Sequence, residues 1–225
     1  MANQFNQYSS AVIRTQESVL ATNTVIRNTY ILLSLTLLFS ALTAGFSMVT
    51  NAPNLGLLTL VGYFGLLFAT QATRNSSLGL FFVFALTGFM GYTLGPLLNT
   101  FLHMHNGAQI IMTALGGTGV IFLSLSAYAL TTRTDFNYMS GFMMAASLIL
   151  FVGVIANLFL KMAMLQLIIA GGFMIFSSAM ILYQTSSIIH GGERNYIMAT
   201  VTLYLAIYNL FISLLQILSV FNNRD

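Results

Sequence analysis

Side chains that could carry out acid–base or metal chemistry are few in this chain. Its 225 residues include four acidic residues, seven lysines and arginines, three histidines and no cysteine. His103 and His105 are two positions apart with no acidic residue near them, whereas zinc sites normally use three or four protein ligands. The absence of cysteine excludes thiol catalysis, disulfides and cysteine-bound metals. These residues therefore predict no enzyme, no metal site and no cofactor.

Two functions found in membrane proteins, serine proteolysis and retinal binding, each require particular side chains that can be looked for in this sequence. A serine protease acting inside the bilayer needs a serine and a histidine base at membrane depth, but all three histidines fall in predicted loops. A retinal-binding protein needs a lysine within its last helix. The single lysine, Lys161, falls between the fifth and sixth predicted helices. Neither chemistry is expected.

The composition is that of a membrane protein. Charged residues make up 5% of the chain and hydrophobic residues 57%, whereas about 25% of residues in a soluble domain are charged. The net charge of +3 is too small to predict nucleic-acid binding. The sequence contains seven continuously apolar runs, each near the ~20 residues that span a bilayer and without the alternation of a membrane barrel, and every charged residue and histidine falls outside them. The runs are 29–50, 55–73, 78–102, 108–132, 136–160, 162–188 and 196–221.

These runs predict an all-α polytopic protein, with a polar tail over residues 1–28 and a seven-helix transmembrane domain over residues 29–225. The tail has no basic start that leads into an apolar run, so it is not expected to be a cleaved signal peptide. Its polar composition favours disorder, although it could form a helix along the membrane surface. The positive-inside rule predicts a cytoplasmic N-terminus and a C-terminus on the other side. With this orientation, five basic residues lie on the cytoplasmic side and two on the opposite side. The five are Arg14, Arg27, Arg74, Arg133 and Arg194, and the two are Lys161 and Arg224.

Small residues predict where helices pack closely, because lipid gives helices no hydrophobic reason to associate. The first run carries Thr36, Ser40 and Ala44, and other runs carry Gly65 and Ala69, Gly91 and Gly95, and Gly141 and Ala145. A cluster in the fourth run, Gly116, Gly117 and Gly119, predicts a crowded helix crossing or else a hinge. Pro96 is expected to kink or end the third helix, since proline has no backbone N–H to donate.

Polar residues follow one face of the last predicted helix. Amide side chains in hydrocarbon need hydrogen-bonding partners, so this face should meet protein or water. We expect it to form a buried polar network with the sixth helix, either as interhelical hydrogen bonds or as the lining of a cavity. The predicted members are Ser177, Gln184, Thr202, Asn209, Ser213 and Gln216.

Several segments are similar to those of one known family. They are residues 26–30 and 32–37, 88–92, 94–100, 126–133, and 188–197 with 203–205 and 208–211. Together they resemble the Bax inhibitor-1 (transmembrane Bax inhibitor motif) family, and within it the bacterial YccA-like branch. The most specific part is the motif loop His190, Gly191, Gly192 and Glu193. The resemblance covers the chain from about residue 20, and it implies six helices packed around a central C-terminal helix.

The same resemblance raises the alternative of an ion leak. Many family members have two facing acids in the last two helices, which are implicated in a pH-sensitive calcium leak. The resemblance implies that the positions of these two acids correspond to Gln184 and Ala206 in this chain. Neither side chain can ionise. Two neighbouring carboxylates share a proton and so sense pH, which these residues cannot do. A leak gated in this way is therefore not expected.

The YccA-like branch implies a different role in the bacterial inner membrane. It implies association with the membrane-anchored AAA+ protease FtsH, and with the FtsH-associated membrane regulators HflK and HflC, as a slowly degraded substrate that restrains the protease. The polar tail suits this role, because at about 3.3 Å per extended residue it is long enough to reach a cytoplasmic protease ring. We expect a modulator of FtsH that is not an enzyme. A calcium leak channel and a purely structural membrane protein remain as alternatives.

Overall fold

The computed structural model describes residues 2–222, with side chains for residues 22–221. The helices are α1 (Ala2–Val49), α2 (Leu57–Thr73), α3 (Ser77–Leu102), α4 (Gly107–Thr132), α5 (Ser140–Leu160), α6 (Ala163–Ile189) and α7 (Tyr196–Asn222), with a 3₁₀ turn at Asn137–Met139. Six apolar segments of 24 to 28 residues are long enough to cross a membrane, one of which combines the 3₁₀ turn with α5. The remaining helix, α2, is a shorter apolar helix of 17 residues. The described chain contains no strand. The prediction of an all-α polytopic membrane protein is confirmed.

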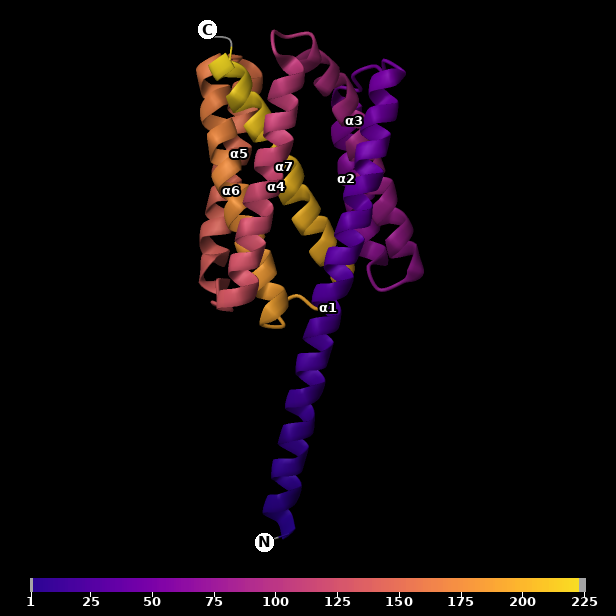
Figure 1. Ribbon diagram of the computed structural model, residues 1–225, viewed down its shortest axis with the longest axis vertical. Helices are drawn as coiled ribbons and strands as arrows, with labels where there is room; N and C mark the ends of the chain where they lie inside the picture. Colours follow the sequence, from indigo (N-terminus) through magenta and orange to yellow (C-terminus); the bar gives the residue numbers. More distant parts are fainter. Residues whose placement is uncertain (1, 223–225) are drawn as a thin grey trace.

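The first helix is longer than the sequence pattern suggested. The predicted boundary between a tail ending at residue 28 and a helix beginning at residue 29 is absent, because α1 runs without a break from Ala2 to Val49. Its N-terminal part extends away from the other helices, as Figure 1 shows. Val25 and Ile26 already pack against the core. Once the packed part of a helix has formed, each further residue adds a hydrogen bond at low cost, so the helix can continue into a polar segment.

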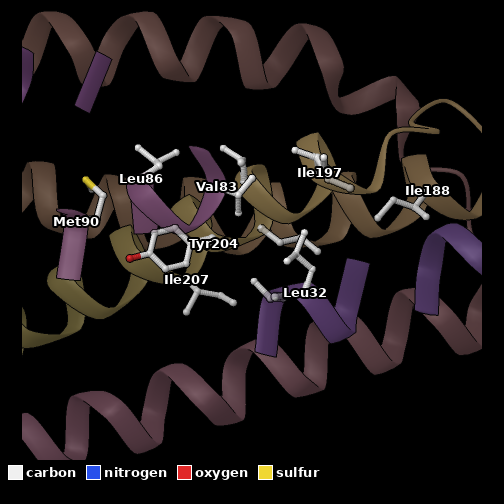
Figure 2. Close-up of a cluster of buried hydrophobic side chains, with 12 residues drawn as sticks. Leu32, Val83, Leu86, Met90, Ile188, Ile197, Tyr204 and Ile207 are labelled. Carbon is white, nitrogen blue, oxygen red and sulfur yellow. The ribbon is translucent and has the colours of Figure 1, made fainter. Parts of the chain in front are cut away.

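The last helix lies at the centre of the bundle. α7 packs against α1, α3, α4 and α6, whereas α2 packs on α3 and α5 packs on α6. Figure 2 shows a core cluster in which the ring of Tyr204 lies among Leu86, Val83 and Ile207. The helix predicted to be central therefore has four main neighbours, and α2 and α5 form an outer layer.

Close packing of α1 on α3 depends on two of the predicted glycines. A Cβ atom added to Gly91 would overlap the backbone oxygen of Ser40, and one added to Gly95 would overlap the side chain of Ser47. The missing side chains thus let the two backbones approach each other, as expected for small residues in membrane helices. Ser40 and Ser47 are both buried at this contact.

Pro96 does not end α3, which continues to Leu102. Proline lacks the N–H that would bond to the carbonyl four residues earlier, which here is the carbonyl of Tyr92. The hydroxyl of Ser47 donates a hydrogen bond to that carbonyl oxygen at 2.7 Å. A side chain of α1 therefore replaces the missing backbone hydrogen bond of α3, which explains how the helix continues through the proline.

The other glycine predictions were wrong. Gly116 and Gly119 have no atom within 4 Å of an added Cβ, and Gly117 would only reach Leu214 at 3.5 Å. Gly65 and Gly141 also face open space. These glycines mark neither a crowded crossing nor a broken helix, since α4 is continuous. Glycine is frequent in membrane helices, so spacing alone does not show which glycines meet a neighbour.

Candidate functional site

A cavity of about 670 Å³ lies where α1 leaves the bundle. Its walls are residues 22–26 of α1, the end of α4 and the motif loop between α6 and α7. Arg133, His190, Glu193 and Arg194 supply its charged and titratable side chains. The family-motif loop and the base of the N-terminal helix, which are far apart in sequence, are thus brought together in one site.

The motif loop begins with a tight cap on the end of α6. Gly191 has a φ of +74°, a conformation that favours glycine because it has no Cβ. The backbone N–H groups of Gly192 and Glu193 both donate to the carbonyl oxygen of Ser187, at 2.8 and 3.1 Å. These bonds satisfy a carbonyl that the helix end would otherwise leave free. The glycines of the motif therefore shape the turn.

Ser186 connects the same helix end to the segment between α4 and α5. Its hydroxyl donates to the carbonyl oxygen of Thr134 at 3.0 Å and accepts from the backbone N–H of Phe136 at 2.9 Å. His190 places its ring Nδ1 2.9 Å from the carbonyl oxygen of Ser186, so the tautomer protonated at Nδ1 donates to it. Sequence reasoning missed Ser186, because a serine near a helix end carries no distinctive signal.

Asn195 connects the motif loop to the turn between α2 and α3. Its amide nitrogen donates to the carbonyl oxygen of Arg74 and to the side-chain oxygen of Asn75, both at 2.9 Å. Its side-chain oxygen accepts from the N–H groups of Ile197 and Met198, at 3.0 and 3.1 Å, and so caps the start of α7.

Glu193 supports this arrangement by accepting a hydrogen bond from the backbone N–H of Asn195 at 2.7 Å. The motif loop is thus a clasp that holds together the ends of α6 and α7 and the two neighbouring connections. Its residues are used in structure, and their geometry does not suggest a catalytic acid and base.

The positions corresponding to the family's acid pair lie inside the bundle. Gln184 is 6% exposed and Ala206 is 4% exposed. Ala206 packs in an apolar cluster with Ile181 and Leu210, and the amide nitrogen of Gln184 has no hydrogen-bond partner. Apart from Tyr204, every buried polar side chain among residues 22–221 is a serine, a threonine or Gln184. The described interior is therefore electrically neutral.

The six residues proposed as one polar network lie in three different settings. Ser177 is fully buried, and like Gln184 it has no hydrogen-bond partner. Thr202 is half-buried, whereas the other three line a groove on the far side of the bundle: Asn209, Ser213 and Gln216. No hydrogen bond joins any two of the six side chains.

The polar contact at the centre of the bundle is made by Tyr204, which sequence reasoning missed. Its hydroxyl lies 2.7 Å from the hydroxyl of Ser40 on α1 and donates to the carbonyl oxygen of Thr87 on α3 at 3.2 Å. The side chain is 1% exposed. A tyrosine opposite a stripe of small hydroxyl residues was the available signal, but only the packing of α7 between α1 and α3 shows that the two meet.

Metal-ligating side chains do not gather anywhere in the described part of the chain, where no group of three or more histidines and acids is found. His103 and His105 are exposed at the turn between α3 and α4. Asp135 accepts a hydrogen bond from the backbone N–H of Asn137 at 2.9 Å, within the connection between α4 and α5.

Several known proteins are similar to this chain over most of its length. A family profile described as "Inhibitor of apoptosis-promoting Bax1" matches residues 22–223. An uncharacterised protein of Pseudomonas aeruginosa is 52% identical over 226 residues, which cover 100% of both chains. The Escherichia coli K12 protein named "Modulator of FtsH protease YccA" is 52% identical over 209 residues, which cover 92% of this chain and 94% of the relative.

An uncharacterised membrane protein of Vibrio cholerae is 43% identical over 211 residues, which cover 93% of this chain and 95% of the relative. The profile begins at residue 22, within α1. The matched region contains the whole seven-helix bundle and the motif loop. The chain belongs to the Bax inhibitor-1 family.

Proposed function

We propose that this protein is a membrane modulator of the FtsH protease and not an enzyme. The observation that carries the proposal is the 52% identity, over 92% of the chain, to the Escherichia coli protein named as such a modulator. The shape of the molecule supports it, because one helix projects from the bundle where a soluble protease domain could grip it (Figure 1). Association with HflK and HflC, as regulators bound to the same protease, is part of the proposal.

The charge distribution supports a cytoplasmic location for the projecting helix. Arg27 lies near its base, and Arg74, Arg133 and Arg194 lie in the connections at the same end of the bundle. The positive-inside rule assigns this end to the cytoplasm. Lys161 lies at the opposite end, between α5 and α6. We therefore propose a multi-pass protein of the bacterial inner membrane, with the N-terminus inside and the C-terminus outside.

The projecting helix has the properties of a handle for an unfolding motor. Residues 2–21 form about 30 Å of helix, at 1.5 Å per residue. Most of the stability of a helix in a protein comes from tertiary packing, and this part of α1 extends away from the other helices (Figure 1), so it can unwind and enter a protease ring as an extended chain. The bundle that follows would then resist extraction, since forced unfolding is limited by the unfolding rate. A protease that is engaged with a bundle it extracts only slowly cannot degrade other substrates. The protein would restrain FtsH in this way.

Copurification tests the proposal most directly. Full-length protein in detergent should recover a proteolytically inactive FtsH, and a variant lacking residues 2–20 should recover much less, because the handle would be missing. The deletion keeps Val25 and Ile26, through which α1 packs against the core, so the bundle is expected to remain folded. A seven-helix membrane protein of another family is the control. Recovery of FtsH no greater than with that control would contradict the proposal.

The alternative, a calcium leak channel, predicts that the protein releases calcium from loaded liposomes. The modulator proposed above should not do so. Because Gln184 and Ala206 cannot ionise and the described interior holds no charge, we expect no calcium release above that of protein-free liposomes, at neutral or acid pH. The Gln184→Leu variant should behave identically, since it removes only an unpartnered amide. A strong flux that Gln184→Leu abolishes would favour the channel over the modulator.

A further inference from the structure

A second hollow lies at the end of the bundle opposite the projecting helix. It is a groove of about 550 Å³ between α5, α6 and the C-terminal half of α7, which lie together at that end in Figure 1. Because α5 packs mainly on α6, the space between α5 and α7 is left open. The α5 span is also the least buried of the six, so the groove opens toward the bilayer.

One wall of the groove consists of polar side chains without protein partners. Asn209, Ser213 and Gln216 follow one face of α7 over two turns, about 10 Å along the axis. None of these side chains forms a hydrogen bond with a described residue, and Ser213 is only 3% exposed. Unpaired amide and hydroxyl groups are costly at membrane depth, so this wall needs an occupant that offers hydrogen-bond acceptors.

The rim of the groove carries a positive charge. Lys161 caps the end of α5 and lines the groove, together with Gln166 in the first turns of α6. The acidic side chains described among residues 22–221, Asp135 and Glu193, lie at the other end of the molecule. Lys161 is exposed and follows directly after the candidate membrane span that ends at Leu160, where a residue is expected to meet lipid headgroups. The rim is therefore suited to an anion.

The opposite wall is mainly apolar. Val154 and Leu158 of α5 and Phe173 of α6 line it, and the one amide there, Asn157, already accepts a hydrogen bond from the backbone N–H of Met162. Leu158 is 67% exposed, so this wall is open to surrounding lipid. We propose that this groove binds one anionic glycerophospholipid. The phosphate contacts Lys161 at the rim, the ester carbonyls accept hydrogen bonds from α7, and one acyl chain lies along α5.

The chemistry of the two walls explains this choice of ligand. The polar wall and the rim offer N–H and O–H donors, and the phosphate and ester oxygens of a diacylglycerol phosphodiester are acceptors. The apolar wall requires hydrocarbon in the same molecule. Water would satisfy the first wall only, and inorganic phosphate would satisfy the rim only. With the orientation proposed above, the lipid would come from the periplasmic leaflet.

Lipid titration of the full chain in detergent tests whether the charge of Lys161 selects an anionic lipid. Native mass spectrometry should show one phosphatidylglycerol retained in preference to phosphatidylcholine. Lys161→Gln should lower the affinity for phosphatidylglycerol about tenfold, the effect of losing one charge-assisted contact. Arg74→Gln is the control, because it removes the same charge from the opposite end and lies outside the groove. Equal losses in the two variants would show nonspecific attraction and overturn the proposal.

Fluorescence quenching tests where the lipid binds. Because the chain has no cysteine, one introduced cysteine can carry a single fluorophore. A fluorophore at Leu158→Cys should be quenched by a smaller mole fraction of bromine-labelled phosphatidylglycerol than one at Leu115→Cys, which is also exposed but lies on α4 outside the groove. Lys161→Gln should abolish the difference, and inorganic phosphate should leave it unchanged. Equal quenching at both positions, or loss of the difference on adding phosphate, would overturn the proposal.

Discussion

Removal of residues 2–20 is expected to turn a slowly degraded protein into one that FtsH leaves intact. An unfolding motor needs an accessible segment to engage, and the projecting part of α1 is the longest segment outside the bundle. The hydrogen bonds of the motif-loop clasp and the packing of Val25 and Ile26 against the core should remain. Pulse-chase labelling in cells with and without the protease measures the change. FtsH-dependent turnover should be lost, and other substrates of the protease should be degraded faster.

A replacement control separates the length of the tail from its sequence. A Gly/Ser-rich segment of the same length is flexible and equally accessible to a motor. It should restore degradation if the tail acts as a handle, and it should fail if specific side chains are recognised. Unchanged turnover of the deletion variant would show that the protease engages another part of the molecule, and would remove the handle from the proposal.

Adding one methyl group at Gly91 is expected to destabilise the bundle strongly. The Cβ of Gly91→Ala would overlap a backbone oxygen of α1, that of Ser40, which cannot move aside as a flexible side chain can. Overpacking of this kind costs about 1–3 kcal/mol. It should also disturb the contact between Ser40 and Tyr204. Thermal unfolding in detergent should show a clearly lower midpoint than for the unmodified protein.

The matched control is the same change at Gly116. This residue is in the middle of α4 and has open space around its added Cβ. Gly116→Ala should therefore be neutral or slightly stabilising, since alanine favours a helix over glycine by up to about 1 kcal/mol. Equal destabilisation by both variants would show that helix packing at Gly91 is not the cause.

The tail deletion and the Gly91→Ala substitution can also be tested together. If resistance of the bundle to extraction restrains the protease, a destabilised bundle should be extracted faster. Gly91→Ala should then be degraded more quickly than the unmodified protein and restrain other substrates less, whereas Gly116→Ala should do neither. Deleting residues 2–20 from the Gly91→Ala variant should again block its degradation.

The motif loop shows how sequence likeness and structure contribute differently. The segment from His190 to Glu193 was recognisable as a family motif, but its role was not. The carbonyl oxygen of Ser187, the side chain of Asn195 and the turn at Arg74 give the motif its role as a clasp. A hydrogen bond between residues 121 positions apart leaves no local trace in the sequence.

The packing of α1 was only partly predictable. The stripe that includes Ser40, and the pair Gly91 and Gly95, were correctly expected to favour close packing, whereas the equally spaced Gly65 and Gly141 meet open space. Spacing shows which face of a helix is smooth, but it does not show which helix lies against that face. The rescue of Pro96 by Ser47 is a second example, because the hydroxyl that replaces the missing N–H comes from another helix.

The number of helices, their approximate membrane spans and the neutrality of the interior could all be predicted from the order of the residues alone. Hydrocarbon imposes these features locally, since each crossing segment must satisfy its own backbone and exclude charge. Three features became apparent only from the packing of the helices: α1 continues beyond the bundle, Tyr204 joins three helices, and Asn209, Ser213 and Gln216 line an open groove instead of meeting α6 in a buried network. These features depend on contacts between residues up to 164 positions apart, and in lipid such contacts are selected by shape and hydrogen bonding, which a hydropathy pattern does not record.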